Sequence, residues 1–404
     1  MPYLLHSAIP FYNFDEEEHT LANIFRKEIE RAFTVGLSTG YTSASSLEEL
    51  GYLVDANCHA LKQINLVLGM YLQEGMPESV YHAAMRLNNT WKSKGIGQIF
   101  VPRGIRNHEK VFLFWNENRE LSGAVIGSAN LSFLVQDARN RTQKEASVFF
   151  DQKDLENFTG LKTELESQME QVLKNSIPID RAPIALIREE NTALKGIDKV
   201  EERTGSEVKR YLQNGLSPVY RIPLKVPGAE DRFSSKDREG HSTYVGSNIN
   251  VCYAKPRINK STGRYKPRDW YEMQLHVGPE IRRSEGYPQR NHPFFILTDD
   301  GYWFKGQTES DDNKQLSAVG NEHILGRWLK GRVAAAGLVH SVDDPWEGDP
   351  QRKGVITREM LKEFGSEFLL FGKTEIQAPD ENGNILDVWY LSFDPKEVNK
   401  NELR

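Results

Sequence analysis

The sequence has few of the features that mark secreted, zinc-bound or membrane proteins. Its 404 residues include only two cysteines, Cys58 and Cys252, too far apart to suggest a disulfide framework or a cysteine-based zinc site. No run of about 18 apolar residues occurs, as a membrane-spanning helix would need. Acidic residues follow the apolar start, which lacks the basic region of a signal peptide. We expect a folded cytoplasmic protein with no membrane partner, no metal and no other cofactor.

The chain also lacks an excess of basic residues. Its 51 lysines and arginines against 57 aspartates and glutamates give a formal net charge of −6. A protein that holds nucleic acid through its overall charge would be basic. Any contact with DNA must therefore be made by a local group of residues.

The length predicts two domains, and the first combines helical and strand-like patterns. Helical spacing of apolar residues occurs at 20–33 and 78–94, and strand-like runs occur at 62–70 and 97–101. A hairpin and a further strand follow, and a helical pattern at 152–175 ends the region. This alternation is typical of an α/β domain with a mixed sheet flanked by helices, which we place at residues 1–180.

The second domain has a different character. We expect a polar connector at 181–215 and a mostly β domain at 216–404. Its strands are predicted at 220–226, 247–254, 270–277, 293–306, 367–376 and 387–394, with one helix at 322–337. Because so many short strands need their edges closed, we predict a barrel or curled sheet.

One predicted hairpin carries the candidate catalytic residues. His108 and Lys110 are predicted to start its first strand and to share a face, while Ser128 and Asn130 end its second strand. The start of one strand lies beside the end of its hairpin partner, so these four side chains should converge. An imidazole, an ammonium, an amide and a hydroxyl suit a phosphodiester, because they supply a nucleophile and donors for the non-bridging oxygens.

These residues can be given roles in phosphodiester hydrolysis. His108 would attack phosphorus to form a phosphohistidine, and Lys110, Asn130 and Ser128 would hold the developing negative charge. Glu145, on the next strand, would accept a hydrogen bond from the imidazole and fix its tautomer. Taken singly, a His-x-Lys pair usually belongs to a surface strand and a Gly-Ser-x-Asn to a turn. Of the ten histidines, however, only His108 has lysine two residues later, and the combination favours function.

Two polar segments of the second domain are candidates for DNA binding. The first is a basic stretch, KPRINKSTGRYKPR (255–268), and the second is a loop that follows a strand. The expected contacts are Asn250, Lys255, Arg257, Lys260, Arg264, Lys266 and Arg268, and then Gln307, Glu309, Asp312, Asn313 and Lys314. Such side chains bind phosphates or donate and accept at base edges. On composition alone, either segment could be a solvated surface loop.

The sequence patterns resemble two known groups of proteins. His-x-Lys, Gly-Ser-x-Asn and a later Glu resemble the phospholipase D superfamily. The segments GSNINVCYAKPR, WYEMQLHV, HPFFILTDDGYWFKG and NEHILGRWLKGRV look like the C-terminal domain of NgoFVII-type and BfiI-type restriction endonucleases. The resemblance covers nearly the whole chain. It implies a metal-independent, sequence-specific restriction endonuclease with a phospholipase D-like nuclease domain and a B3-like pseudobarrel, which grips the major groove of double-stranded DNA with two arms, near 246–268 and 307–316.

The resemblance also has implications for partners. Superfamily active sites use two copies of the motif, in which one histidine attacks and the other protonates the leaving oxygen. This chain has one copy, so we expect a homodimer with a single site across its twofold axis. A restriction endonuclease further implies a cognate DNA methyltransferase in the same restriction-modification system.

Three other interpretations stay open. A phospholipase D-like lipid phosphodiesterase or phosphatidyl transferase would use the same histidine, although the basic, β-rich domain would then be unexplained. A DNA-binding protein with a silent catalytic half is the second. The third is a nuclease that acts only with a separate NTP-driven helicase-like subunit, since this chain has no Gly-x-x-x-x-Gly-Lys-Ser/Thr loop.

Overall fold

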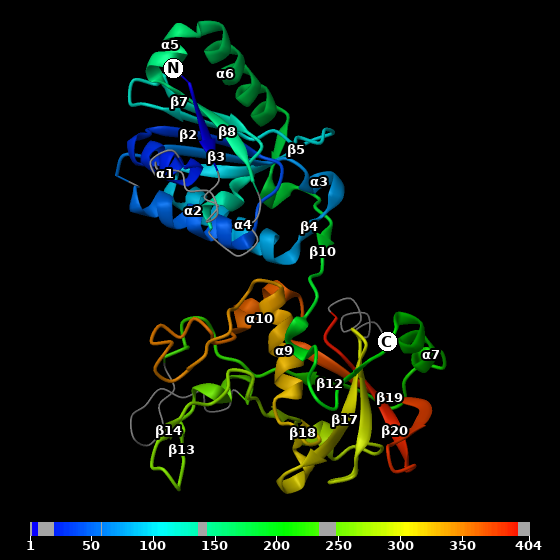
Figure 1. The fold of residues 1–404 in the computed structure, drawn as a ribbon. Helices are drawn as coiled ribbons and strands as arrows, with labels where there is room; N and C mark the ends of the chain where they lie inside the picture. The colour runs from blue at the N-terminus through cyan, green and yellow to red at the C-terminus, as the bar shows by residue number, and fades with distance from the viewer. Residues whose placement is uncertain (1, 7–19, 58, 136–143, 234–247, 395–404) are drawn as a thin grey trace. The chain divides into compact units, whose positions relative to one another are not determined.

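The chain divides into two compact units, Met1–Glu189 and Glu190–Arg404. A computed structural model describes residues 2–6, 20–57, 59–135, 144–233 and 248–394 (Figure 1). The second unit begins inside the segment 181–215 that we expected to be a connector, and Leu194 from this segment is buried in the core of that unit. In the described part of the chain, no helix is long and apolar enough to cross a membrane.

The first unit is built on a mixed sheet with the strand order β1-β8-β7-β6-β2-β3-β5-β9. β2, β3 and β5 run parallel, and β6, β7, β8 and β1 pair antiparallel. The strands are β1 (Tyr3–His6), β2 (Thr34–Thr39), β3 (Gln63–Leu68), β4 (Met76–Pro77), β5 (Gly97–Pro102), β6 (Val111–Trp115), β7 (Leu121–Gly127), β8 (Ala146–Asp151), β9 (Ser176–Pro178) and β10 (Leu186–Ile187). The short β4 and β10 form a separate parallel pair.

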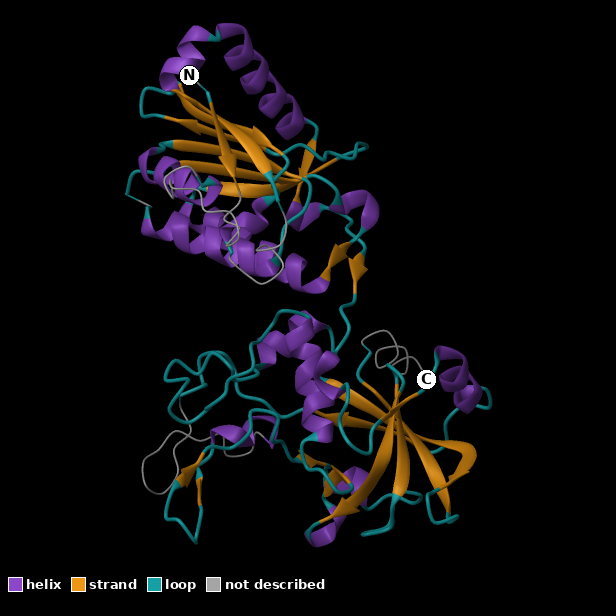
Figure 2. Ribbon diagram, viewed as in Figure 1, coloured by secondary structure: helices purple, strands orange, loops and turns teal. Residues whose placement is uncertain are grey.

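Helices cover both faces of this sheet (Figure 2). The helices are α1 (Leu21–Arg31), α2 (Ala44–Ala56), α3 (Tyr71–Glu74), α4 (Glu78–Lys94), α5 (Gln152–Asn157) and α6 (Thr159–Lys174), with short 3-10 turns at Leu131–Leu134 and Ile179–Arg181. The side chains of successive β6 residues point to opposite faces of the sheet, because side chains alternate along a strand. Phe112 belongs to the core under α1, α2 and α4, whereas Leu113 packs with Leu155 and Leu165 of α5 and α6. This is the α/β domain that the sequence predicts.

The helix predicted at 152–175 is two helices rather than one. α5 ends at Asn157 and α6 begins at Thr159. Phe158, between them, has φ −109° and ψ 58°, which is outside the helical region. The change of direction lets both Leu155 and Leu165 reach the same face of the sheet.

The second unit contains a curled sheet with the main order β12-β19-β20-β16-β17-β18-β15, and β11 pairs with β17. Its strands are β11 (Glu201–Glu202), β12 (Val219–Pro223), β13 (Arg257–Ile258), β14 (Tyr265–Lys266), β15 (Leu275–His276), β16 (Phe294–Thr298), β17 (Tyr302–Glu309), β18 (Gln315–Ala318), β19 (Phe368–Pro379) and β20 (Ile385–Ser392). Its helices are α7 (Gly205–Leu212), α8 (Pro279–Arg282), α9 (Ile324–Ala335) and α10 (Arg358–Phe364). Short 3-10 turns lie at Thr192–Leu194, Asn248–Tyr253 and Asp311–Asn313.

The core of the second unit lies between this half-barrel and α9. Trp328 and Leu329 of α9 are fully buried among Ile296, Phe304 and Phe371 from the strands. A second cluster fills the opposite face of the sheet under α7. The mostly β domain expected from the sequence is confirmed, with a half-barrel as its frame.

Three details of the second unit differ from the prediction. It holds α7, α8 and α10 as well as the one helix that we expected. The stretch 247–254 contains a 3-10 turn instead of a strand, because its buried residues, Ile249, Cys252 and Tyr253, have helical spacing. Most of 270–277 is irregular, since the buried Trp270 turns inward and its indole donates to the carbonyl of Gly354 at 2.8 Å.

We predict that Gly69→Ala destabilises the first unit. A Cβ at this position would lie 1.7 Å from the carbonyl oxygen of Asn107, so the backbone would have to move. The expected loss in the free energy of unfolding is about 1–3 kcal/mol, measured by urea denaturation. Gly160→Ala on α6 is the matched control, because a Cβ there meets nothing within 4 Å. Equal stability of the two variants would contradict the packing described.

Candidate active site

His108 and Lys110 lie on the extended segment that enters β6, which begins one residue after Lys110. The prediction that they start the strand is therefore off by a few residues. Asn107 fixes this segment. Its buried side chain donates to Ser38 Oγ at 3.0 Å and accepts from the backbone N–H of Glu109 at 3.1 Å. The backbone that carries the imidazole is held against β2.

The ammonium of Lys110 lies against the imidazole of His108. Its Nζ is 2.9 Å from Nδ1 and 3.1 Å from Nε2, and it donates to the carbonyl of His108 at 2.7 Å. Lys110 is mostly buried, whereas His108 is exposed. Burial lowers the pKa of Lys110, and the charge of Glu145 opposes this shift. The arrangement keeps an ammonium beside an exposed imidazole.

The end of β2 fixes the orientation of the Asn130 amide. Asn130 Oδ1 accepts from the backbone N–H of Tyr41 at 3.0 Å and lies 3.2 Å from Thr39 Oγ1. A backbone N–H can only donate, so the atom that faces it must be the amide oxygen. The amide nitrogen of Asn130 therefore points away from Tyr41, where it can donate to a ligand.

Gly40 and Tyr41, which the sequence analysis did not select, form a wall beside His108. A Cβ at Gly40 would lie 2.5 Å from His108 Cδ2, so a larger residue would displace the imidazole. The Tyr41 ring meets the imidazole edge-on, with centroids 5.6 Å apart and planes at 72°. The sequence signal was an apolar strand at 34–39 that ends in a glycine, but only the strand order connects it to His108.

Ser128 and Glu145 meet because β7 pairs with β8, with Gly127 opposite Ser147. The Ser128 hydroxyl donates to the carboxylate of Glu145 and accepts from the backbone N–H of Ala146 at 3.2 Å. We expected Glu145 to bind the imidazole. The structure instead gives the carboxylate the Ser128 hydroxyl as a hydrogen-bond partner, and its charge acts on Lys110.

The five predicted catalytic residues therefore form one connected group at the ends of three neighbouring strands, β6, β7 and β8, and the end of β2 lies beside them. Tyr41 joins two of them, since it contacts His108 through its ring and Asn130 through its backbone. The group holds one carboxylate, and across the described ranges no three His, Cys, Asp or Glu residues gather as metal ligands do. The group presents an exposed imidazole, an ammonium and the amide nitrogen of Asn130.

The basic stretch of the second unit forms the hairpin β13–β14, which turns at Gly263 with φ +63°. Five of its predicted contacts are exposed: Lys255, Arg257, Lys260, Arg264 and Lys266. Arg268 is partly buried and reaches Glu272 at 2.5 Å, and Arg257 reaches the same carboxylate oxygen at 2.7 Å. Residues 246 and 247 of this expected arm lie outside the described residues.

Asn250 has a structural role that the sequence analysis did not foresee. It is 1% exposed, and its amide donates to the carbonyl of Ile356 at 2.9 Å and accepts from the N–H of the same residue at 3.0 Å. Both ends of its amide thus bind the backbone of a neighbouring segment. The prediction that Asn250 contacts DNA is corrected on this ground.

The tip of the β17–β18 hairpin is shaped by Asp312 and Asn313. The Asp312 carboxylate accepts from Arg283 at 2.6 Å and from Arg282 at 2.8 Å, and these hydrogen bonds lower its pKa to about 2. Asn313 donates to the carbonyl of Pro288 at 2.6 Å. Both predicted contacts therefore help to build the loop, and the two arginines, at the end of α8, are basic residues beside this arm that the sequence analysis missed.

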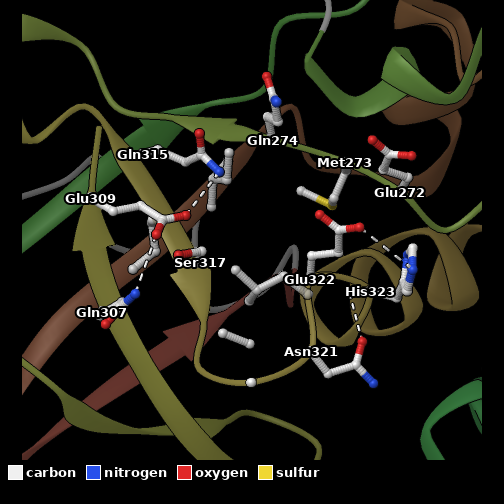
Figure 3. Close-up of a pocket in the computed structure, with 15 residues that line it drawn as sticks. Glu272, Met273, Gln274, Gln307, Glu309, Gln315, Ser317, Asn321, Glu322 and His323 are labelled. Atoms are coloured by element: carbon white, nitrogen blue, oxygen red, sulfur yellow. Dashed lines mark hydrogen bonds and ion pairs between the residues drawn. The ribbon is translucent and has the colours of Figure 1, made fainter. Parts of the chain in front are cut away.

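Gln307 and Glu309 line a cleft of about 550 Å³ in the second unit (Figure 3). Glu309 accepts a hydrogen bond from Gln307 and another from Gln315, both at 3.2 Å. Lys314, the remaining predicted contact, is half-buried, and its carbonyl accepts from the N–H of Val277 at 2.8 Å. The second arm thus presents amides and a carboxylate to solvent.

Two protein-family models match this chain. Residues 19–185 match the NgoFVII restriction endonuclease N-terminal PLD (phospholipase D-like) domain, and residues 228–363 match the NgoFVII C-terminal B3-like DNA-binding domain. The fold and these matches define a restriction endonuclease of the phospholipase D superfamily with a B3-like DNA-binding domain. The two matched ranges together cover most of the sequence, in the order of the family. The chain belongs to the NgoFVII restriction endonuclease family.

Two solved structures are distantly similar to this chain. A polyphosphate kinase from Porphyromonas gingivalis matches with 14% identity and a TM-score of 0.30, over 59% of this chain and 34% of that one. The yeast tyrosyl-DNA phosphodiesterase matches with 12% identity and a TM-score of 0.27, over 60% of this chain and 55% of that one. This chain thus spans about a third of the length of the polyphosphate kinase and about half of the length of the phosphodiesterase. No curated protein matches the sequence.

The contacts of Thr39 lead to a stability prediction. Its buried hydroxyl donates to the carbonyl of Tyr41 at 2.9 Å and lies beside Asn130 Oδ1. Thr39→Val keeps the shape but leaves buried acceptors without this donor, so we expect the free energy of unfolding to fall by about 1–2 kcal/mol. Thr39→Ser, which keeps the hydroxyl, should lose less than Thr39→Val. Urea titration of both variants checks this, and a valine variant as stable as the parent would refute it.

Proposed function

We propose that this protein is a sequence-specific endonuclease that hydrolyses DNA phosphodiester bonds without a metal, through a covalent phosphohistidine on His108. The observation that carries the proposal is the contact of Lys110 Nζ with the exposed imidazole. A cation beside a nucleophile can neutralise the phosphate that the nucleophile attacks. Asn130 supplies a neutral amide donor on the adjacent strand end, and Ser128 would join it only by turning its hydroxyl away from Glu145.

The reaction would proceed in two displacements. A ring nitrogen of His108 attacks phosphorus and forms an N–P bond, while one P–O ester bond breaks. The leaving oxygen takes a proton from a second histidine acting as general acid. Water then attacks phosphorus and gives its proton to that histidine, and the N–P bond breaks. DNA with a new terminal phosphate leaves, and both histidines return to their starting state.

The second histidine would come from a second copy of the chain. The sequence has one His-x-Lys motif of this kind, whereas the mechanism needs an attacking imidazole and a proton-donating one. A homodimer with one site across its twofold axis meets this need. His108 is exposed in the single chain, as an imidazole that faces a partner copy across the substrate must be.

The second unit would choose the sequence to be cut. Its family match is to a DNA-binding domain, and its exposed arginines and lysines gather on hairpin β13–β14. Double-stranded DNA in the cytoplasm is the proposed substrate, and a cognate DNA methyltransferase would protect the same sites in the host. A separate NTP-driven helicase-like subunit is a further proposed partner, which the cleavage experiment below can reveal.

Plasmid cleavage in EDTA tests the proposed reaction. The parent protein should cut at discrete positions with EDTA present, because the site relies on His108, Lys110 and Asn130 rather than on a metal ion. His108→Ala should show no cutting. Its unfolding midpoint should match that of the parent, and its DNA affinity should stay within a factor of two. Gel analysis and end sequencing provide the readout. Cleavage that EDTA abolishes and magnesium restores would rule out the mechanism. No cleavage by the parent at all would call for a helicase-like partner.

The pH dependence of cleavage should report on Lys110. Burial places its pKa below the ordinary 10.5, and only the protonated form can neutralise the phosphate. The rate should therefore fall as pH rises through this lowered pKa, with an alkaline limb below pH 10.5. Lys110→Arg stays charged throughout this range and should remove that limb, at a lower maximal rate. Identical pH profiles for the two proteins would show that Lys110 does not act through its charge.

A further inference from the structure

The cleft in the second unit is lined on one side by the β17–β18 hairpin. Gln307 pairs with Ser317 across the hairpin, and Glu309 pairs with Gln315. Because residues two apart on a strand share a face, these four polar side chains lie on one face of the hairpin. Figure 3 shows these four side chains along one wall of the cleft, and Asn321 and Glu322 along the other wall.

Acceptors dominate the polar lining of this cleft. The residues that line it include carboxylates, amides, one serine and one histidine, and the described lining includes no lysine or arginine. Arg257 and Arg268 instead lie in an adjacent smaller cleft. A phosphate would therefore be drawn to the neighbouring basic hairpin and repelled by the cleft. What enters the cleft should therefore carry no negative charge and be rich in hydrogen-bond donors.

Glu309 organises the acceptors. Each of its two oxygens takes one hydrogen bond, from Gln307 on one side and Gln315 on the other, both at 3.2 Å. Both amide nitrogens thus face the carboxylate, and Ser310 donates to the amide oxygen of Gln315 at 3.2 Å. A carboxylate has more acceptor sites than these two bonds use, so Glu309 can accept further hydrogen bonds.

DNA offers two neutral donors in its major groove. They are the N6 amino group of adenine and the N4 amino group of cytosine, which Asn, Gln, Glu and Asp side chains bind. Guanine presents acceptors there and is read mostly by arginine or lysine. The cleft and the basic hairpin therefore suit different parts of the same duplex.

We propose that this cleft reads the exocyclic amino group of adenine or cytosine in the major groove, with Glu309 as the central acceptor and Gln307 and Gln315 beside it. The proposal rests on the proposed function, since it requires that the second unit recognises a DNA sequence. It adds the chemical class of the base atoms that are read, and it assigns to Gln315 a role in specificity that the sequence did not indicate.

The test begins with full-length His108→Ala protein, so that DNA is bound but not cut. A randomised duplex library is selected for binding to define the recognition sequence. Each adenine in that sequence is then replaced by the purine nucleoside that lacks the amino group, and each cytosine by the corresponding 2-pyrimidinone. Guanines are replaced in parallel by 7-deazaguanine, which loses the N7 acceptor but keeps its other groups. Affinities are measured at one fixed salt concentration.

We expect removal of the amino group at one or more fixed positions to weaken binding by about tenfold, in line with the loss of a good base contact. Glu309→Gln and Gln315→Ala should weaken binding to the natural sequence and should lose sensitivity to that same base change. Glu381→Gln is the matched control, because Glu381 is a mostly exposed carboxylate on the β19–β20 turn that pairs with Lys305 and does not line the cleft; this variant should bind as the parent does.

Three results would overturn the proposal, and they are distinguishable. If a sequence is selected but every amino deletion is tolerated within twofold, while 7-deazaguanine weakens binding, the basic hairpin reads the bases and the cleft does not. If Glu309→Gln leaves the pattern of base sensitivity unchanged, the cleft is likewise excluded. If no sequence is enriched at all, the sequence-reading function itself fails and the proposal fails with it.

Discussion

The close approach of the end of β2 to the segment before β6 is the contact on which the candidate site depends. Gly40 leaves room for the imidazole, and the next residue, Tyr41, both contacts that imidazole and orients the amide of Asn130. The contact exists because β2 lies between β3 and β6 in the sheet, so a strand from early in the chain borders the later hairpin. A side chain at Gly40 would disturb the imidazole of His108 and the amide of Asn130 together.

In the second unit, two carboxylates each form ion pairs with two arginines. Glu272 pairs with Arg257 and Arg268, and Asp312 pairs with Arg282 and Arg283. Such pairing fixes long side chains before any ligand arrives and lowers the conformational entropy that binding would cost. It also explains how a chain of net charge −6 can present local basic surfaces. The acceptor-lined cleft lies beside the first of these pairs.

Much of the fold and the central residues of the site could be predicted from the sequence, because they depend on local patterns. His108, Lys110, Ser128 and Asn130 flank one hairpin, so alternation and strand pairing were enough to bring them together. Gly40 and Tyr41 could not be found, since they meet His108 only through a long-range strand order. The hydrogen bond from Ser128 to Glu145 could not be predicted for a similar reason, because it depends on the register of β8 against β7.

In the second unit, composition located the arms but did not separate contact residues from structural ones. Asn250, Asp312 and Asn313 are polar residues on arms, yet their side chains bind protein groups. Conversely, the acceptor role of Gln315 appears only once its cross-strand pairing with Glu309 is known. Polar side chains near a binding surface take either role, and burial together with hydrogen-bond partners decides which.

The central claim is that His108 becomes covalently attached to DNA phosphate during cleavage. The most direct measurement starts from a cleavage reaction on DNA that contains the recognition site, stopped with denaturant under alkaline conditions, where phosphohistidine survives. The modified peptide is then identified by mass spectrometry. The account predicts a phosphoramidate-linked nucleotide on His108 that grows and decays at the rates of cleavage, and that is absent from His108→Ala. Single-step cleavage with no adduct at any time, or an adduct on another residue, would contradict it.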